Sequence, residues 1–154
     1  MEDVMAHKTW EDYLAGQQFR TSALTVTETH VVVFSGITGD YHPLHMNEEY
    51  AKQMPFKTRI AQGPLIFSMA VGLVIQAGVF GDSVIAWLGG NNLKFIKPVI
   101  PGDTVYVEAE VLSTKETSAP DRGIANFLYT VKNQHEETVV QVEMTFLMHR
   151  SLVR

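Results

Sequence analysis

The feature that most constrains the fold is a run over residues 60–81 that carries no charged side chain. Such a run is long enough to cross a bilayer, but Gln62, Pro64 and Gln76 interrupt it and no stop-transfer pattern flanks it. A helix that is apolar all round is also typical of the centre of a globular domain. The sequence therefore predicts a buried central helix over about 64–80 and no membrane span.

The second half of the chain has the composition of antiparallel strands. Val105, Val107 and Ala109 alternate with more polar neighbours, a pattern typical of a strand with one buried face. Pro101-Gly102 indicates a type II turn, because glycine supplies the positive φ at its third position. We expect four strands, over residues 84–99, 104–116, 123–134 and 137–149.

The first half adds one strand and short helices. Residues 19–28 are rich in β-branched side chains and predict a strand. Thr27 or Thr29 can cap a short helix through residues 31–34, and Asn47 can cap another. An antiparallel sheet wrapped around one central apolar helix satisfies this order of elements, because both the helix and the sheet face need burial. The expected fold class is α+β.

Composition places the chain among ordinary globular domains. It has 154 residues, of which 45% are hydrophobic and 19% charged, enough for one domain with a real core. The net charge is −5 without any Lys/Arg cluster, so nucleic-acid binding lacks its electrostatic footprint. The absence of cysteine excludes disulfides, thiolate metal sites and a cysteine nucleophile. Residues 1–8 carry charge of both signs and no apolar stretch, so we expect no signal peptide and a cytoplasmic protein.

The densest polar cluster is Gly-Asp-Tyr-His-Pro-Leu-His at residues 39–45. On a loop bent by glycine and proline, the Asp40 carboxylate and the His45 imidazole can converge on one point. Such a pair can polarise a water molecule and move its proton. An Asx-type turn followed by exposed histidines explains the same residues. A metal site from Asp40, His42 and His45 is a third interpretation, but no other cluster offers a fourth ligand, and we predict no metal.

The start of the apolar helix is a second candidate site. Free amides at a helix N-terminus can bind a developing oxyanion, and Gly63 lets a ligand carbonyl approach the backbone closely. Taken alone, these residues favour an ordinary turn into a helix. A Ser-His-Asp triad is not indicated, because Ser35, Ser68 and Ser83 all lie outside any Gly-x-Ser-x-Gly elbow.

Three segments carry a resemblance to a known family. They read Ser-Gly-Ile-Thr-Gly-Asp-Tyr-His-Pro-Leu-His-Met-Asn-Glu-Glu-Tyr-Ala (35–51), Ile-Ala-Gln-Gly-Pro-Leu (60–65) and Leu-Lys-Phe-Ile-Lys-Pro-Val-Ile-Pro-Gly-Asp-Thr-Val (93–105). In this order they resemble the MaoC-like dehydratases, the (R)-specific enoyl-CoA hydratases known as hydratase 2. The resemblance implies a single hot-dog domain over 1–154, with its core at about 19–149, and a homodimer or higher homo-oligomer.

The resemblance also implies an activity. It is the reversible hydration of a 2-enoyl-CoA to a 3-hydroxyacyl-CoA, in fatty acid metabolism, without a cofactor. By analogy, Asp40 and His45 are the catalytic pair, and the Gly63 amide donates to the thioester carbonyl. Gln62, His42 and Ser68 are further candidates for contact with the substrate.

The sequence departs from the family pattern at two of these positions. His42 stands where asparagine is common, and Gln62 stands where histidine is common. Both changes bear on substrate choice more than on the reaction, because Asp40 and His45 are retained. Two other functions stay open at this point: a hot-dog acyl-CoA thioesterase, whose carboxylate activates water toward the carbonyl, and a non-catalytic acyl-thioester binding module.

Overall fold

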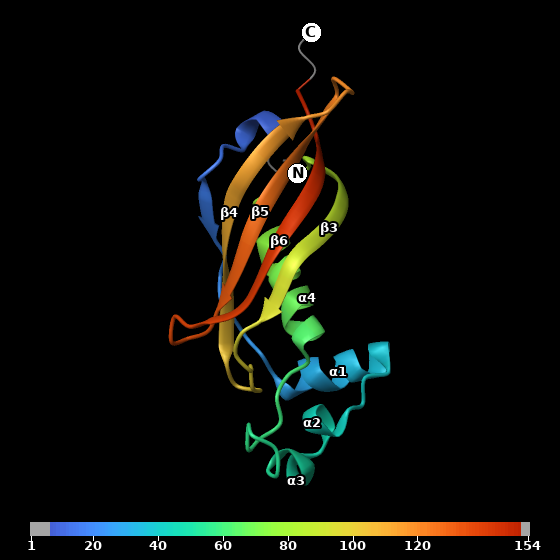
Figure 1. Ribbon diagram of the computed structural model, residues 1–154, viewed down its shortest axis with the longest axis vertical. Coiled ribbons are helices and arrows are strands. Elements are labelled where there is room, and N and C mark those ends of the chain that lie inside the picture. The colour runs from blue at the N-terminus through green and yellow to red at the C-terminus, as the bar shows by residue number, and fades with distance from the viewer. Residues whose placement is uncertain (1–6, 152–154) are drawn as a thin grey trace, which may run out of the picture.

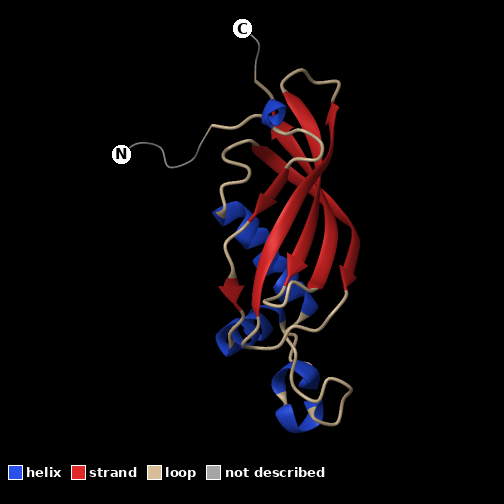
Figure 2. Ribbon diagram, turned by 90° about the vertical axis from the view of Figure 1, so that its left-hand side faces the viewer, coloured by secondary structure: helices blue, strands red, loops and turns tan. Residues whose placement is uncertain are grey.

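The computed structural model describes residues 7–151. The N-terminal segment on which the signal-peptide expectation rests lies almost entirely outside the described residues. Within these residues, six strands form an antiparallel sheet in the order β1-β4-β5-β6-β3, and β2 pairs with the start of β4. Figures 1 and 2 show this sheet curving along one long helix. The strands are β1 (Gln18–Arg20), β2 (Leu24–Thr25), β3 (Val84–Phe95), β4 (Thr104–Glu116), β5 (Arg122–Lys132) and β6 (Thr138–His149).

The strands β3 to β6 confirm the four strands predicted from the sequence. Alternate side chains of β4, β5 and β6 are buried and join one core cluster with the central helix. The predicted type II turn is present as well. Gly102 has a φ of 105°, and the N–H of Asp103 donates to the carbonyl of Ile100 at 3.0 Å.

The single strand expected over 19–28 is wrong, because β1 and β2 are separate. Thr21 lies between them and is buried. Its N–H donates to the carbonyl of Val107, but its hydroxyl Oγ1 replaces the backbone as acceptor for the Val107 N–H at 3.0 Å. A side chain that takes over a ladder bond interrupts the strand.

The central helix α4 (Gly63–Gln76) lies against the inner face of the sheet (Figure 2). It ends before the predicted Phe80, because Gly78 turns the chain with a left-handed φ of 66°. Burial is also less complete than predicted, since Ile75 is 57% exposed. No helix in residues 7–151 combines the length and hydrophobicity that a membrane span needs. The buried side of α4 consists of Leu65, Ile66, Ala70, Leu73 and Val74.

Short helices form a lobe beyond one end of the sheet (Figure 1). They are α1 (Glu28–Thr38), α2 (Pro43–Met46) and α3 (Glu48–Ala51). The predicted caps are confirmed: Thr27 accepts a hydrogen bond from the first turn of α1, and Asn47 does the same for α3. The helix α2 falls in a stretch for which the sequence suggested only a bent loop.

The two ends of the described chain meet through Glu11, on the short 3-10 helix η1 (Trp10–Asp12). Its carboxylate accepts hydrogen bonds from the N–H of Ser151 at 3.0 Å and from Nε of Arg150 at 3.1 Å. Burial alone would raise the pKa of Glu11, but these bonds outweigh it and lower the pKa from 4.5 to about 2.

We expect Glu11→Gln to lower the free energy of unfolding at pH 7 by about 1 kcal/mol, a discounted figure because the Glu11 side chain is 35% exposed. The folded-state pKa lies below the unfolded one, so this stabilisation is present above pH 4.5 and is lost as the pH falls toward 2. Urea titrations at pH 7, 5 and 3 should show the variant and the wild type converging in acid. An equal gap at pH 7 and pH 3 would contradict this.

Candidate active site

The loop after α1 is shaped by short-range hydrogen bonds. Gly39 ends the helix in the left-handed region, with a φ of 77°. Thr38 Oγ1 accepts the N–H of Asp40 at 3.3 Å, and Asp40 Oδ1 accepts the N–H of His42 at 3.3 Å. The Asx-type turn considered from the sequence therefore exists. It occupies one carboxylate oxygen of Asp40 and leaves Oδ2 available.

The next residues start α2. Pro43 takes the first helical position, where its missing N–H costs nothing. His42 caps the helix, because its Nδ1 accepts the N–H of Leu44 at 3.2 Å. This short helix brings His45 back toward the Asp40 loop.

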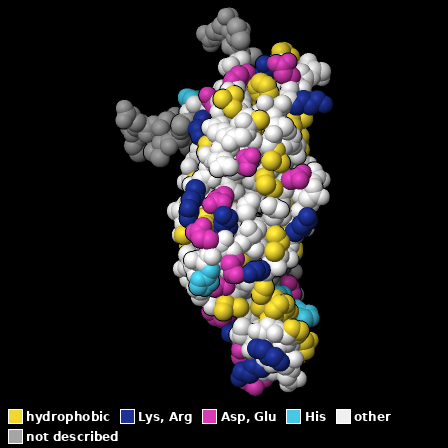
Figure 3. Space-filling view, turned by 60° about the vertical axis from the view of Figure 1, so that its left-hand side comes forward, with side chains coloured by type: hydrophobic (Ala, Val, Ile, Leu, Met, Phe, Trp, Pro, Cys, Tyr) yellow, Lys and Arg dark blue, Asp and Glu magenta, His cyan; other side chains and the backbone are white. Residues whose placement is uncertain are grey.

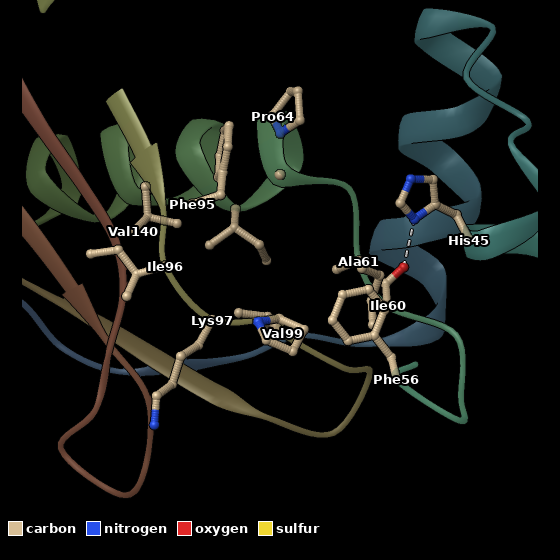
Figure 4. Close-up of a pocket in the computed structure, with 13 residues that line it drawn as sticks. His45, Phe56, Ile60, Ala61, Pro64, Phe95, Ile96, Lys97, Val99 and Val140 are labelled. Atoms are coloured by element: carbon tan, nitrogen blue, oxygen red, sulfur yellow. Dashed lines mark hydrogen bonds between the residues drawn. The ribbon is translucent and has the colours of Figure 1, made fainter. Parts of the chain in front are cut away.

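The imidazole of His45 is oriented by a backbone carbonyl. Its Nδ1 lies 2.7 Å from the carbonyl oxygen of Ile60 (Figure 4). A carbonyl oxygen can only accept, so Nδ1 carries the proton. In the neutral ring, Nε2 therefore has a free lone pair.

The free atoms of the two side chains face each other. His45 Nε2 lies 3.9 Å from Asp40 Oδ2, and the side chains are 13% and 41% exposed. This separation is too long for a direct hydrogen bond, yet one water oxygen can reach both atoms at the usual distance of about 2.8 Å. Within residues 7–151, no three His, Asp or Glu side chains gather in a way that could hold a metal ion.

The start of α4 supplies a backbone donor. Gly63 is its first residue, so the N–H of Gly63 has no partner inside the helix and lies at the positive end of the helix dipole. A β-carbon at this position would lie 2.8 Å from the ring of Phe95. A side chain here would therefore force the Phe95 ring to move, and glycine lets the backbone pass beneath the ring as it stands.

A cavity of about 350 Å³ connects these groups. His45 and Gly63 both line it, together with side chains that are almost all apolar. It lies where the helical lobe meets the sheet, and hydrophobic side chains gather at this junction in the space-filling view (Figure 3). In Figure 4, Lys97 points away from it. The other lining residues are Phe56, Ile60, Ala61, Pro64, Ile66, Phe95, Ile96, Lys97, Pro98, Val99 and Val140.

The remaining candidates from the sequence lie outside this lining. Gln62 is fully buried; its Nε2 donates to Ser35 Oγ at 2.8 Å, and its Oε1 has no hydrogen-bond partner in the described part of the chain. His42 is exposed and caps α2. Ser68 donates its hydroxyl to the backbone of its own helix at 2.8 Å. The structure thus brings Asp40 beside His45, and it places His45 and Gly63 on one cavity, whose lining does not include Asp40.

Two groups that shape the site were missed from the sequence. Phe95 covers the start of α4, and it belongs to the 93–105 segment that carries the family resemblance, so a signal existed. The carbonyl of Ile60 orients His45. No sequence signal could identify it, because every residue carries a carbonyl and only the fold selects one.

Comparison with known proteins identifies the class. A model of the MaoC-like domain matches residues 12–133, and the chain belongs to this family. YdeM of Bacillus subtilis (strain 168), an uncharacterised protein, is 32% identical over 142 residues, which cover 91% of this chain and 98% of YdeM. The (R)-specific enoyl-CoA hydratase of Rhodospirillum rubrum is 36% identical over 110 residues, covering 71% of this chain and 73% of that enzyme.

Solved structures identify the fold. An Archaeoglobus protein described as a monoamine oxidase regulatory protein superposes with a TM-score of 0.90 at 33% identity, covering 97% of this chain and 100% of that one. A Mycobacterium tuberculosis protein with a double hotdog fold gives a TM-score of 0.83 at 21% identity, covering 96% of this chain and 46% of that one. The chain has the hot-dog fold, as the sequence predicted.

We expect the two neighbouring histidines to adopt opposite tautomers when neutral. His45 donates from Nδ1 to a carbonyl, whereas Nδ1 of His42 accepts an amide N–H and leaves the proton on Nε2. Imidazole ¹⁵N–¹H correlation spectra in mildly alkaline buffer distinguish the two forms, and His42 serves as the internal control. A proton on Nε2 of neutral His45 would contradict the described geometry.

Proposed function

We propose that this protein reversibly hydrates a 2-enoyl-CoA to a 3-hydroxyacyl-CoA. The observation that carries the proposal is the arrangement at one apolar cavity. His45 and the Gly63 amide both line it, and the free oxygen of Asp40 lies 3.9 Å from His45 Nε2. An apolar cavity with few convergent polar groups is typical of a small-molecule site.

The chemistry follows from what each group can do. Asp40 Oδ2 and His45 Nε2 hold one water molecule and accept its proton as the water oxygen bonds to C3. The same pair returns a proton to C2, so both side chains end the cycle unchanged. Charge meanwhile develops on the thioester oxygen, where a fixed backbone donor such as the Gly63 N–H stabilises it. Dehydration is the reverse of these steps.

The family supports this choice of reaction. Its relatives include proteins named (R)-specific enoyl-CoA hydratase, from Rhodospirillum rubrum and from Aeromonas caviae, which are 36% and 33% identical to this chain over the matched residues. The substrate is proposed as a coenzyme A thioester on this basis. The cavity supports an apolar acyl group, since almost all of its lining is hydrocarbon.

The direct test is the loss of enoyl-thioester absorbance with crotonyl-CoA and longer 2-enoyl-CoA substrates. Asp40→Asn and His45→Gln should each lower kcat/KM by about two orders of magnitude or more, because each removes one of the two groups that hold and deprotonate water. His149→Gln is the matched control, since His149 is exposed at the end of β6 away from the helical lobe (Figure 1).

A thiol assay run in parallel separates the alternatives. Release of free coenzyme A without loss of the double bond would identify a thioesterase instead. Binding of enoyl-CoA without any turnover by the wild type would identify a binding module. Full activity of either Asp40→Asn or His45→Gln would contradict the proposed pair.

We further propose that the protein forms a homodimer through β3. Among residues 7–151, β3 is an edge strand of the sheet, and an exposed edge is a template for pairing with another chain. Apolar side chains are exposed along it: Ile85, Trp87, Leu88 and Leu93 range from 38% to 52% exposed. Large apolar side chains exposed along an edge strand support an interface there.

Leu88→Lys should convert the dimer to a monomer, because it places a charge in the proposed interface. Light scattering coupled to size-exclusion chromatography measures the mass directly. Leu112→Lys is the control, because Leu112 is also an exposed leucine but lies on β4, which β5 and β6 separate from β3 in the sheet. A wild-type monomer, or equal behaviour of the two variants, would contradict the proposal.

A further inference from the structure

We propose that Arg59 is a positioning residue that holds the Asp40–His45 pair in its working geometry. The inference rests on the hydratase function proposed above. Arg59 is not among the residues that line the cavity, so it acts through other groups. Its guanidinium joins the segments that carry the catalytic side chains.

The guanidinium makes contacts on two helices. Nη1 and Nη2 of Arg59 donate to the two carboxylate oxygens of Glu28, at 2.6 and 3.2 Å. Its Nε donates to Oε2 of Glu48 at 3.1 Å. The planar fork of arginine fits a carboxylate in this two-bonded way, which a lysine cannot reproduce.

Glu48 also holds the backbone that precedes the site. Its Oε2 accepts the N–H of Arg59 at 3.3 Å, and its Oε1 accepts the hydroxyl of Thr58 at 3.1 Å. The bond from Arg59 lowers the pKa of Glu48, and the bond to Glu28 raises the pKa of Arg59. Both shifts favour the charged forms of Glu48 and Arg59, and the bonds of Glu48 hold both the side chain and the backbone of Arg59.

The residue after Arg59 contacts the catalytic histidine. The carbonyl oxygen of Ile60 accepts a hydrogen bond from Nδ1–H of His45, with 2.7 Å between the two heavy atoms. The N–H of Ile60 donates to the carbonyl of Leu44 at 3.4 Å. The planar peptide unit between Arg59 and Ile60 couples Arg59 to the N and Cα atoms of Ile60. The Ile60 carbonyl belongs to the next peptide unit, whose Ala61 N–H donates to the carbonyl of Val99 at 2.7 Å, so Arg59 and the Val99 contact hold the two sides of Ile60. The orientation of the His45 ring follows the Ile60 carbonyl.

The two carboxylates extend this control to both catalytic groups. Glu28 begins α1, and the loop at the other end of α1 carries Asp40. Glu48 begins α3, directly after the short helix that carries His45. One cation thus joins the first residues of α1 and α3 to the residue before Ile60, and the segments that carry Asp40 and His45 continue from these helices.

The chain offers a control that separates a positioning role from the loss of an ion pair. Arg122 makes a similar two-bonded pair with Asp121, at 2.9 Å for both bonds, but it contacts no part of the site. Exposed ion pairs contribute little to global stability. If the Arg59 variant loses activity and the Arg122 variant does not, the loss comes from the place of Arg59 in the fold. Loss of an ion pair by itself would affect both variants alike.

The experiment compares Arg59→Lys with Arg122→Lys in the full-length chain. Each variant keeps its positive charge and loses the forked geometry. Initial rates with a 2-enoyl-CoA give kcat and KM separately, and imidazole ¹⁵N–¹H spectra report the tautomer of His45 without any need for turnover. Thermal unfolding monitored by circular dichroism checks that each variant is folded.

We expect Arg59→Lys to lower kcat by at least about tenfold and to change KM by less than about threefold, because a small misplacement of catalytic groups affects the transition state more than binding. The His45 spectrum should lose its pure Nδ1–H signature. Arg122→Lys should match the wild type in both measurements. Should Arg59→Lys not fold, Glu28→Gln, which leaves the bond from Arg59 to Glu48, is expected to lower kcat by about threefold or more.

The proposal is overturned if Arg59→Lys keeps kcat within about twofold and leaves the His45 spectrum unchanged, or if KM alone rises. An equal loss of activity in Arg122→Lys would also overturn it. If the wild type hydrates no enoyl thioester, the proposed function fails separately, and the His45 spectra of the two arginine variants then decide the positioning role.

Discussion

The packing of α4 against the inner face of the sheet is the constraint on which the rest of the structure depends. The helix has no charged side chain, and alternate residues of β4, β5 and β6 bury its inner side. This burial is the main favourable term available to a chain with neither disulfides nor a described metal cluster. It also fixes where the first residue of the helix lies relative to the end of β3.

The site is a consequence of that placement. The free amide of Gly63 lies at the start of α4, where a β-carbon would meet the ring of Phe95 from β3 at 2.8 Å. The helical lobe then brings Asp40 and His45 to the same junction. In the proposed function, the sheet and helix supply the donor and the apolar wall, and the lobe supplies the pair that moves protons. This division is typical of enzymes that place chemistry on loops held by a scaffold.

The two positions that depart from the family pattern have different physical roles. Gln62 is buried and joins α4 to α1 through Ser35 and the carbonyl of Val31. A neutral amide can make such a link at less cost than a charged group in the same place. His42 is exposed and caps α2. Both residues shape the backbone around the cavity, and neither lines it.

The sequence by itself determined the four strands that follow the central helix, the central helix itself, the caps at Thr27 and Asn47, and the family. Periodicity, turn residues and motifs are local signals, so the sequence carries them. The break between β1 and β2, the early end of α4 and the helix α2 were not predicted, since each depends on a particular side-chain bond or backbone turn. Only the tertiary structure decided that the carbonyl of Ile60 orients His45 and that Arg59 ties the surrounding segments together. These contacts join residues whose proximity the fold creates, and no local pattern in the chain encodes them.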